Sequence, residues 1–155
     1  MKQHSMRFIF KMILIMSLLL IGCSGKHLRV NDDNTAELYG CYPLPNCVSS
    51  NTWVPYNWTP KFEPAIPQDE AWIKIKKVLS EWPRTKIIEE NNIYIHAKCT
   101  SLVFRFVDNL ELLLHPEQNL ISVRSSSTIA LWDIGVNHWR IYKLRSQLKE
   151  LNIIK

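Results

Sequence analysis

The chain has 155 residues, 46% of them apolar, with 19 Lys and Arg against 14 Asp and Glu. This length and composition predict one globular domain and exclude a disordered or collagen-like chain. The total of four glycines argues against a glycine-rich nucleotide-binding loop. Three of the basic residues lie among the first 22 residues, which contain no acid, so the rest carries 16 basic against 14 acidic side chains. A charge near +2 attracts nucleic acid only weakly, and we expect no nucleic-acid partner.

The N-terminal segment has the pattern of an export signal. Lys2 and Arg7 precede an apolar run over residues 12–21, which is too short to cross a bilayer core that takes roughly 20 apolar residues. The run leads into Leu-Ile-Gly-Cys at residues 20–23, which resembles a bacterial lipobox. The resemblance implies that residues 1–22 are removed and that Cys23 carries lipid, such as palmitate, as a membrane anchor.

Two other interpretations of this segment stay open, an uncleaved anchor helix and an ordinary signal peptide followed by a chance cysteine. Ser24, directly after the cysteine, resembles the outer-membrane address of Gram-negative lipoproteins. We therefore expect an exported, lipid-anchored protein of the cell envelope, facing the periplasm from the outer membrane if the organism has one. Residues 23–40 are polar without periodicity, which is typical of a flexible tether.

Three cysteines follow the lipobox. Cys41 and Cys47 enclose five residues with two prolines, and an oxidising compartment permits a disulfide between them. Two reduced thiols or a metal pair are the alternatives, although metal pairs commonly have closer spacing and a second pair of ligands. Cys99 is the odd thiol, and we expect it to be buried as a small apolar residue. We expect no metal and no other cofactor.

The regular part of the domain is preceded by a strap over residues 41–67, which holds six of the eight prolines. Proline lacks a backbone donor, so we expect an extended segment packed on the domain. Apolar residues at helical spacing then predict a helix from a cap at Asp69 to about Glu81.

Four extended stretches follow, bounded by turns or alternating in polarity. They cover residues 85–90, 93–99, 102–114 and 120–126. The third is long enough to need a bulge or bend near Asp108 and Asn109. A final helix is expected after a cap at Asn137. The predicted fold is α+β, a single domain over residues 41–155 with an antiparallel sheet of about four strands covered on one face by two helices.

Three segments together carry a family pattern. They are residues 41–50 (CYPLPNCVSS), residues 94–111 (YIHAKCTSLVFRFVDNLE), and residues 123–127 (VRSSS) with 133–140 (DIGVNHWR). In this order they resemble the DUF1499 family of bacterial exported proteins and lipoproteins, over roughly residues 41–150. The resemblance implies no settled biochemical activity. The sequence departs from the pattern at Thr128 and His138, where the family more often has arginine, and this weakens an anion-binding role.

The third segment supplies a candidate polar site. Its members come from a strand end, a loop and a helix start: Arg124, Ser125, Ser127, Asp133, Asn137 and Arg140. Hydroxyls and guanidinium groups beside a helix N-terminus can hold a carboxylate or a phosphate. The alternative is structural, with Asp133 paired to Arg124 or Arg140 to pin the loop.

A second polar cluster is expected at the bend of the third strand, as a site or as a structural network. Its members are Ser101, Arg105, Asp108 and Glu111. Ser101 and His96 could suggest a nucleophile and its base, but there is no G-x-S-x-G elbow and their spacing does not bring them together. His96 and Cys99 point to opposite faces of a strand, so they cannot chelate a metal without a bulge.

Two classes of function follow from these observations. The first is a non-enzymatic envelope lipoprotein that binds a partner protein or a small anionic or lipid ligand. The alternative is an envelope enzyme with its site at Arg124, Ser127, Asp133 and Arg140. A purely structural spacer in the envelope is a third possibility.

Overall fold

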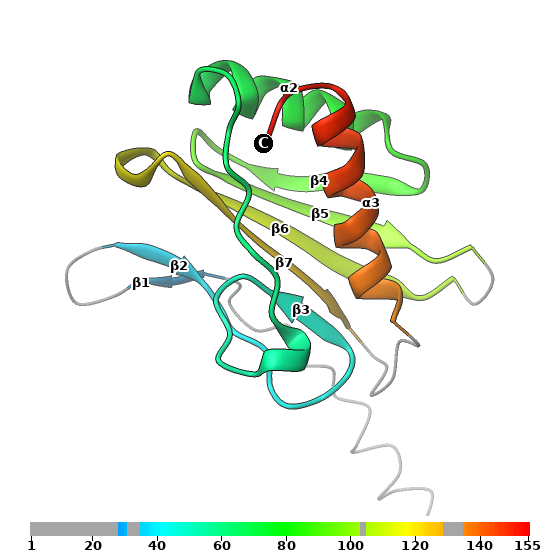
Figure 1. The fold of residues 1–155 in the computed structure, drawn as a ribbon. Helices are drawn as coiled ribbons and strands as arrows, with labels where there is room; N and C mark the ends of the chain where they lie inside the picture. Colours follow the sequence, from blue (N-terminus) through cyan, green and yellow to red (C-terminus); the bar gives the residue numbers. More distant parts are fainter. Residues whose placement is uncertain (1–27, 31–34, 103–104, 129–134) are drawn as a thin grey trace, which may run out of the picture.

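The computed structural model describes residues 28–30, 35–102, 105–128 and 135–155 (Figure 1). The helices and strands in these ranges, in chain order, are β1 (Leu28–Val30), β2 (Ala36–Leu38), β3 (Cys47–Ser49), η1 (Pro55–Asn57), α2 (Gln68–Glu81), β4 (Thr85–Glu90), β5 (Tyr94–Thr100), β6 (Val107–His115), η2 (Pro116–Gln118), β7 (Leu120–Ser127) and α3 (Val136–Glu150). The elements η1 and η2 are single 3-10 turns.

The main sheet has five antiparallel strands in the order β3-β7-β6-β5-β4. The prediction of a single α+β domain with an antiparallel sheet is confirmed. The strand missing from the prediction is β3, which the strap contributes and which pairs with the end of β7. Three residues between prolines are too few to show an alternating pattern, so pairing with β7 defines this strand, not its own sequence.

Both helices pack against one face of this sheet (Figure 1). The helices bury one apolar stripe each, and the strands meet them with alternate residues, as a period of two requires. The buried members of this core include Trp72, Ile75, Leu79, Leu110, Leu112, Ile141, Leu144 and Leu148. Burial of this apolar surface is the main force that holds the helices on the sheet.

The other face of the sheet carries a smaller apolar cluster. Leu38 of β2 is buried against Tyr94 and Leu113. Strands β1 and β2 pair with each other as a two-stranded antiparallel sheet, so part of the predicted tether over residues 23–40 is folded. The buried Leu38 shows that the folded domain begins before Cys41.

The described residues contain no helix that is both long enough and apolar enough to span a membrane.

Three local predictions were wrong in detail. Helix α2 begins at Gln68 after Pro67, so Asp69 lies in the first turn, where its charge suits the helix dipole, and makes no capping bond. Helix α3 is preceded by Gly135 in the left-handed region, with a φ of 78°, which glycine adopts easily; Asn137 is already inside the helix.

The third wrong detail concerns the predicted bulge near Asp108. Strand β6 pairs with both neighbours without a break through this region. The extra length lies in the connection from β5, where Ser101 N donates to Phe106 O and Phe106 N donates to Ser101 Oγ. The register shift of the sheet lies in β4, between Ile87 and Glu89.

Candidate functional site

The residues predicted to form one polar site lie on opposite faces of the sheet. In β7, Ser125 pairs with Leu110 and faces the helices, whereas Arg124 pairs with Glu111 and faces the other side. Neighbouring residues of a strand always point in opposite directions, so the two cannot share a site. Asp133 and Cys23 lie outside the described residues.

A buried ion pair joins α3 to β6 on the helix-covered face. Arg140 Nη2 lies 2.5 Å from Asp108 Oδ2, and both side chains are almost completely buried. Arg140 Nη1 donates to Ser125 Oγ at 2.8 Å and to Asn137 Oδ1 at 2.6 Å. The ion pair joins Asp108, from the second predicted cluster, to Arg140, from the first. Ser125 can bind the same arginine because β7 and β6 are neighbours in the sheet.

Asn137 extends this network to the strap. Its Nδ2 donates to the backbone oxygen of Asn46 at 2.9 Å and to Ser127 Oγ at 3.1 Å. Ser125 Oγ donates to Asn137 Oδ1 at 2.6 Å. The network therefore fixes the start of α3 to β7 and to the loop between Cys41 and Cys47, which favours the structural interpretation of these residues.

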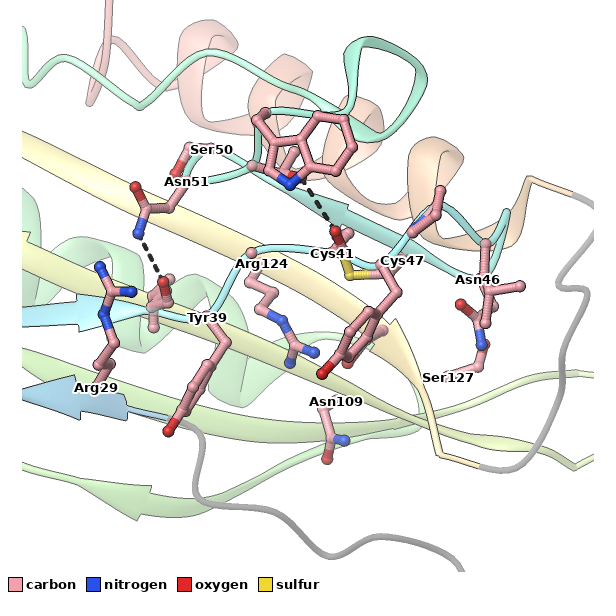
Figure 2. Close-up of a pocket in the computed structure, with 18 of the residues that line it drawn as sticks. Arg29, Tyr39, Cys41, Asn46, Cys47, Ser50, Asn51, Asn109, Arg124 and Ser127 are labelled. Atoms are coloured by element: carbon pink, nitrogen blue, oxygen red, sulfur yellow. Dashed lines mark hydrogen bonds between the residues drawn. A yellow bond between two sulfur atoms is a disulfide. The ribbon is translucent and has the colours of Figure 1, made fainter.

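A pocket of about 1080 Å³ opens on the other face, between the sheet and the segment from β1 to the strap (Figure 2). Asn109, Arg124 and Ser126 come from the sheet, and Asn109 and Ser126 are buried. The volume matches sites that take ligands of a few hundred daltons. Figure 2 shows Arg124 between Tyr39 and the Cys41–Cys47 disulfide.

Arg124 is held in the pocket by an ion pair with a buried carboxylate. Its Nη1 lies 2.5 Å from Glu111 Oε2, and the Arg124 side chain is 16% exposed while that of Glu111 is fully buried. Tyr94 Oη donates to Glu111 Oε1 at 3.1 Å. Burial, and then the neighbouring Glu111, raise the pKa of Tyr94 far above its usual value, so Tyr94 stays a neutral donor. Both carboxylate oxygens are thus occupied, and the guanidinium is fixed in orientation.

One edge of this guanidinium is unsatisfied. Arg124 Nε is buried and has no hydrogen-bond partner among the residues that the structure describes. A buried donor without an acceptor costs about 1–3 kcal/mol. Because Nε itself is buried, a ligand oxygen can accept from it only if neighbouring groups move; such a bond would remove this cost, and a charge-assisted bond is stronger than a neutral one.

The other lining residues contribute amide and hydroxyl groups, which can form hydrogen bonds, and apolar surface. Of the described lining residues, the two that carry charge are Arg29 and Arg124. Arg29 Nη2 lies 2.9 Å from Glu37 Oε2. Asn51 Nδ2 donates to the backbone oxygen of Leu38 at 2.8 Å, which ties the strap to β2. Guanidinium, amide and hydroxyl groups in this arrangement suit an anion.

The disulfide between Cys41 and Cys47 is confirmed, with Cα atoms 5.7 Å apart. Both cysteines line the pocket, so the crosslink shapes its wall. Cys99 is free and buried, as predicted. Burial raises the pKa of its thiol, which keeps it protonated.

The other members of the second predicted cluster separate in the structure. Ser101 and Arg105 lie in the connection between β5 and β6, where Arg105 is exposed. Asp108 and Glu111 face opposite sides of β6. His96 lies on the pocket side, with its Nε2 2.9 Å from Asn109 Oδ1.

Sequence reasoning missed the contribution of the strap and of β1 to the pocket. Tyr39, Asn51 and Trp53 line it, together with Arg29. The available signal was a proline-rich segment with exposed aromatic residues closed by a disulfide. Trp53 in this segment is 84% exposed, and exposed large apolar side chains that lie together indicate an interaction surface.

Comparison with known protein families assigns this α+β domain to a family that is defined by sequence similarity. A family model described as a protein of unknown function, DUF1499, matches residues 37–148. The chain belongs to this family, and its resemblance over roughly residues 41–150 is confirmed. No curated protein and no solved structure matches the chain.

Proposed function

We propose that the chain is a lipoprotein of the cell envelope, anchored through lipid on Cys23, whose domain binds a small amphiphilic anion in the pocket over Arg124. The observation that carries this proposal is the Arg124 guanidinium in the lining of a pocket of about 1080 Å³, with a buried Nε that has no partner among the described residues. The binding domain is proposed to be non-enzymatic. Its role would be to hold the ligand at the membrane to which the lipid tethers it.

The ligand class follows from the two kinds of lining. The strands supply Arg124, Asn109 and Ser126, which suit a carboxylate or a phosphate. The strap supplies aromatic and aliphatic surface, including Leu44 and Trp53. A ligand that satisfies both has an anionic group and an apolar chain or ring.

Calorimetric titration of the full chain in a neutral detergent tests the binding proposal, with octyl phosphate and the uncharged octyl glucoside as probes. We expect the phosphate to bind and the glucoside to bind at least tenfold more weakly, since a charge-assisted hydrogen bond contributes about 1.5–3 kcal/mol. Equal binding of both probes would contradict an anion site.

A double variant removes the charge from the pocket without leaving a buried ion. Glu111→Gln with Arg124→Gln replaces the pair by two neutral amides, whereas Arg124→Gln alone would leave the Glu111 carboxylate buried and unpaired. We expect the double variant to lose the preference for octyl phosphate. Arg105→Gln is the matched control, because Arg105 is exposed away from the pocket, and it should keep that preference.

The anchor is tested separately by the intact mass of the mature chain. We expect a chain that begins at Cys23 and carries acyl groups. A chain that retains residues 1–22, or an unmodified cysteine, would contradict the lipoprotein proposal.

A further inference from the structure

The Arg124 side chain, 16% exposed, lies on the sheet side of the pocket, and large exposed aromatic side chains lie at its edge, while the buried lining is mixed and includes Leu38 and the Cys41–Cys47 disulfide. Asn109 and Ser126, on the strands, are buried, whereas Tyr42 and Trp53, at the mouth, are 82% and 84% exposed. Leu44 beside them is also exposed. Large apolar side chains gathered and exposed in this way mark an interaction surface. We call Tyr42, Leu44 and Trp53 the aromatic rim.

The position of Arg124 relative to the aromatic rim distinguishes two sources of ligand. An amphiphile taken from water gains most when its apolar part is deepest and its charged group stays at the mouth. A lipid in a bilayer presents the reverse order to a protein on the surface, because its head group is outermost and its chains remain in the membrane. The pocket with Arg124 on the sheet side and the aromatic rim at its edge matches the second case.

The chain connects this rim closely to the proposed anchor. Cys23 precedes Leu28, the first residue of β1, by five positions. An extended chain spans at most about 3.6 Å per residue, so the lipid attachment point lies within roughly 18 Å of β1. Arg29 of β1 lines the pocket. An anchor at Cys23 would therefore keep β1, and the pocket that Arg29 lines, within reach of the bilayer.

The charge and the side chains at the mouth suit a membrane surface. In the sequence, Lys26, outside the described residues, and Arg29, which is paired with Glu37, follow the proposed anchor, and basic residues beside a lipid anchor are attracted to anionic head groups. Tyrosine and tryptophan concentrate at the interface of a bilayer, where one end of the ring system is apolar and the other is hydrated. Trp53 and Tyr42 are placed to occupy that layer.

We infer that the aromatic rim rests on the bilayer that holds the Cys23 lipid, and that the pocket takes the head group of an anionic phospholipid directly from it. This inference rests on the proposed function and names the ligand as a membrane lipid. The anionic group would accept from the Arg124 guanidinium, and the acyl chains would pass the rim and remain in the bilayer.

Fluorescence quenching by brominated phospholipids tests the position of the rim. The mature lipidated chain is reconstituted into vesicles of phosphatidylethanolamine and phosphatidylglycerol, with and without bromine on the acyl chains. Trp53 is one of six tryptophans, so we expect bromine to quench roughly one sixth of the emission. Trp53→Phe should abolish that quenching. Trp139→Phe, at a residue that is 60% exposed on α3 on the opposite side of the sheet, should leave it intact.

Quenching that persists unchanged in Trp53→Phe, or that is absent in the wild type, overturns the inference. A second measurement separates the two sources of the anion, since native mass spectrometry after release from the vesicles reports bound phosphatidylglycerol. Glycerol phosphate added in solution is the comparison. Binding of glycerol phosphate with no bound lipid overturns the inference but keeps the proposed anion site. A wild-type chain with no lipid on Cys23 instead shows that the proposed anchor has failed.

Discussion

Each face of the sheet holds an arginine against a buried carboxylate, and the two faces differ in what surrounds the pair. On the helix side, Arg140 donates to Asp108, Ser125 and Asn137. On the pocket side, Arg124 donates to Glu111, and its buried Nε has no partner among the described residues. The first pair is closed by α3, while the second adjoins an open volume. We interpret the first pair as part of a structural network and propose that the second forms part of a binding site.

The largest expected effect lies in the closed pair. Asp108→Ala leaves the Arg140 charge buried without its carboxylate, and we expect a loss of about 3–5 kcal/mol in the free energy of unfolding. Urea denaturation followed by circular dichroism measures it. Asp69→Ala, in the exposed first turn of α2, is the control and should cost less than about 1 kcal/mol. A loss of similar size in both variants would contradict the structural role of Asp108.

The open pair should respond differently to single and double changes. Arg124→Gln alone strands the fully buried Glu111, so we expect it to lose stability in urea. Adding Glu111→Gln should restore much of that stability, because no buried charge remains. The coupling between the two sites, obtained from a double-mutant cycle, should exceed about 1 kcal/mol. Strictly additive effects would show that the ion pair does not organise this face.

The disulfide lines the pocket and closes the loop that contains Asn46. This loop is short, and chain entropy predicts about 2 kcal/mol of stabilisation. We expect Cys41→Ser with Cys47→Ser to lose that amount in urea and to weaken the binding of octyl phosphate, because both cysteines line the pocket. Dithiothreitol should destabilise the wild type and leave the double variant unchanged. If the reduced protein binds octyl phosphate with unchanged affinity, the disulfide does not contribute to binding in the pocket.

The smallest effect concerns His115, on the same side of the sheet as Glu111. Burial, and then Lys61, lower the pKa of His115 below 6.5 in the folded chain. The unfolded chain therefore binds more protons between the folded pKa and 6.5, so stability should rise with pH through that window and level off above it. His115→Gln should flatten this part of the profile in urea titrations from pH 5 to 8. A wild-type profile that falls with rising pH would reverse the assigned direction.

Much of the fold was predictable because apolar spacing records which side of an element is buried. The stripes of α2 and α3 and the alternation of β5 are local patterns. Strand β3 was not predictable in this way, because its pairing with β7 joins residues about 75 positions apart. The same limit hid the contact of Asp108 with Arg140, because it joins β6 to α3 across 32 positions of the chain.

The candidate site was predicted in composition and not in arrangement. Arg124 and Ser125 are neighbours in a strand, and strand geometry alone could have assigned them to opposite faces. The pocket itself needed the structure, because β1, β2 and the strap reach it from segments that show no periodic pattern. Leu38 and Asn51 connect those segments, and nothing in their local sequence marks that contact.

Native mass spectrometry of the chain extracted from the envelope shows whether the anchored domain carries an anion at Arg124. We expect an acylated Cys23, an intact Cys41–Cys47 disulfide, and a bound anionic amphiphile on the wild type. The amphiphile should be missing from the Glu111→Gln, Arg124→Gln double variant and present on the Arg105→Gln control. An acylated wild-type chain without any bound amphiphile, or an amphiphile that stays on the double variant, would contradict the claim that Arg124 forms the anion site.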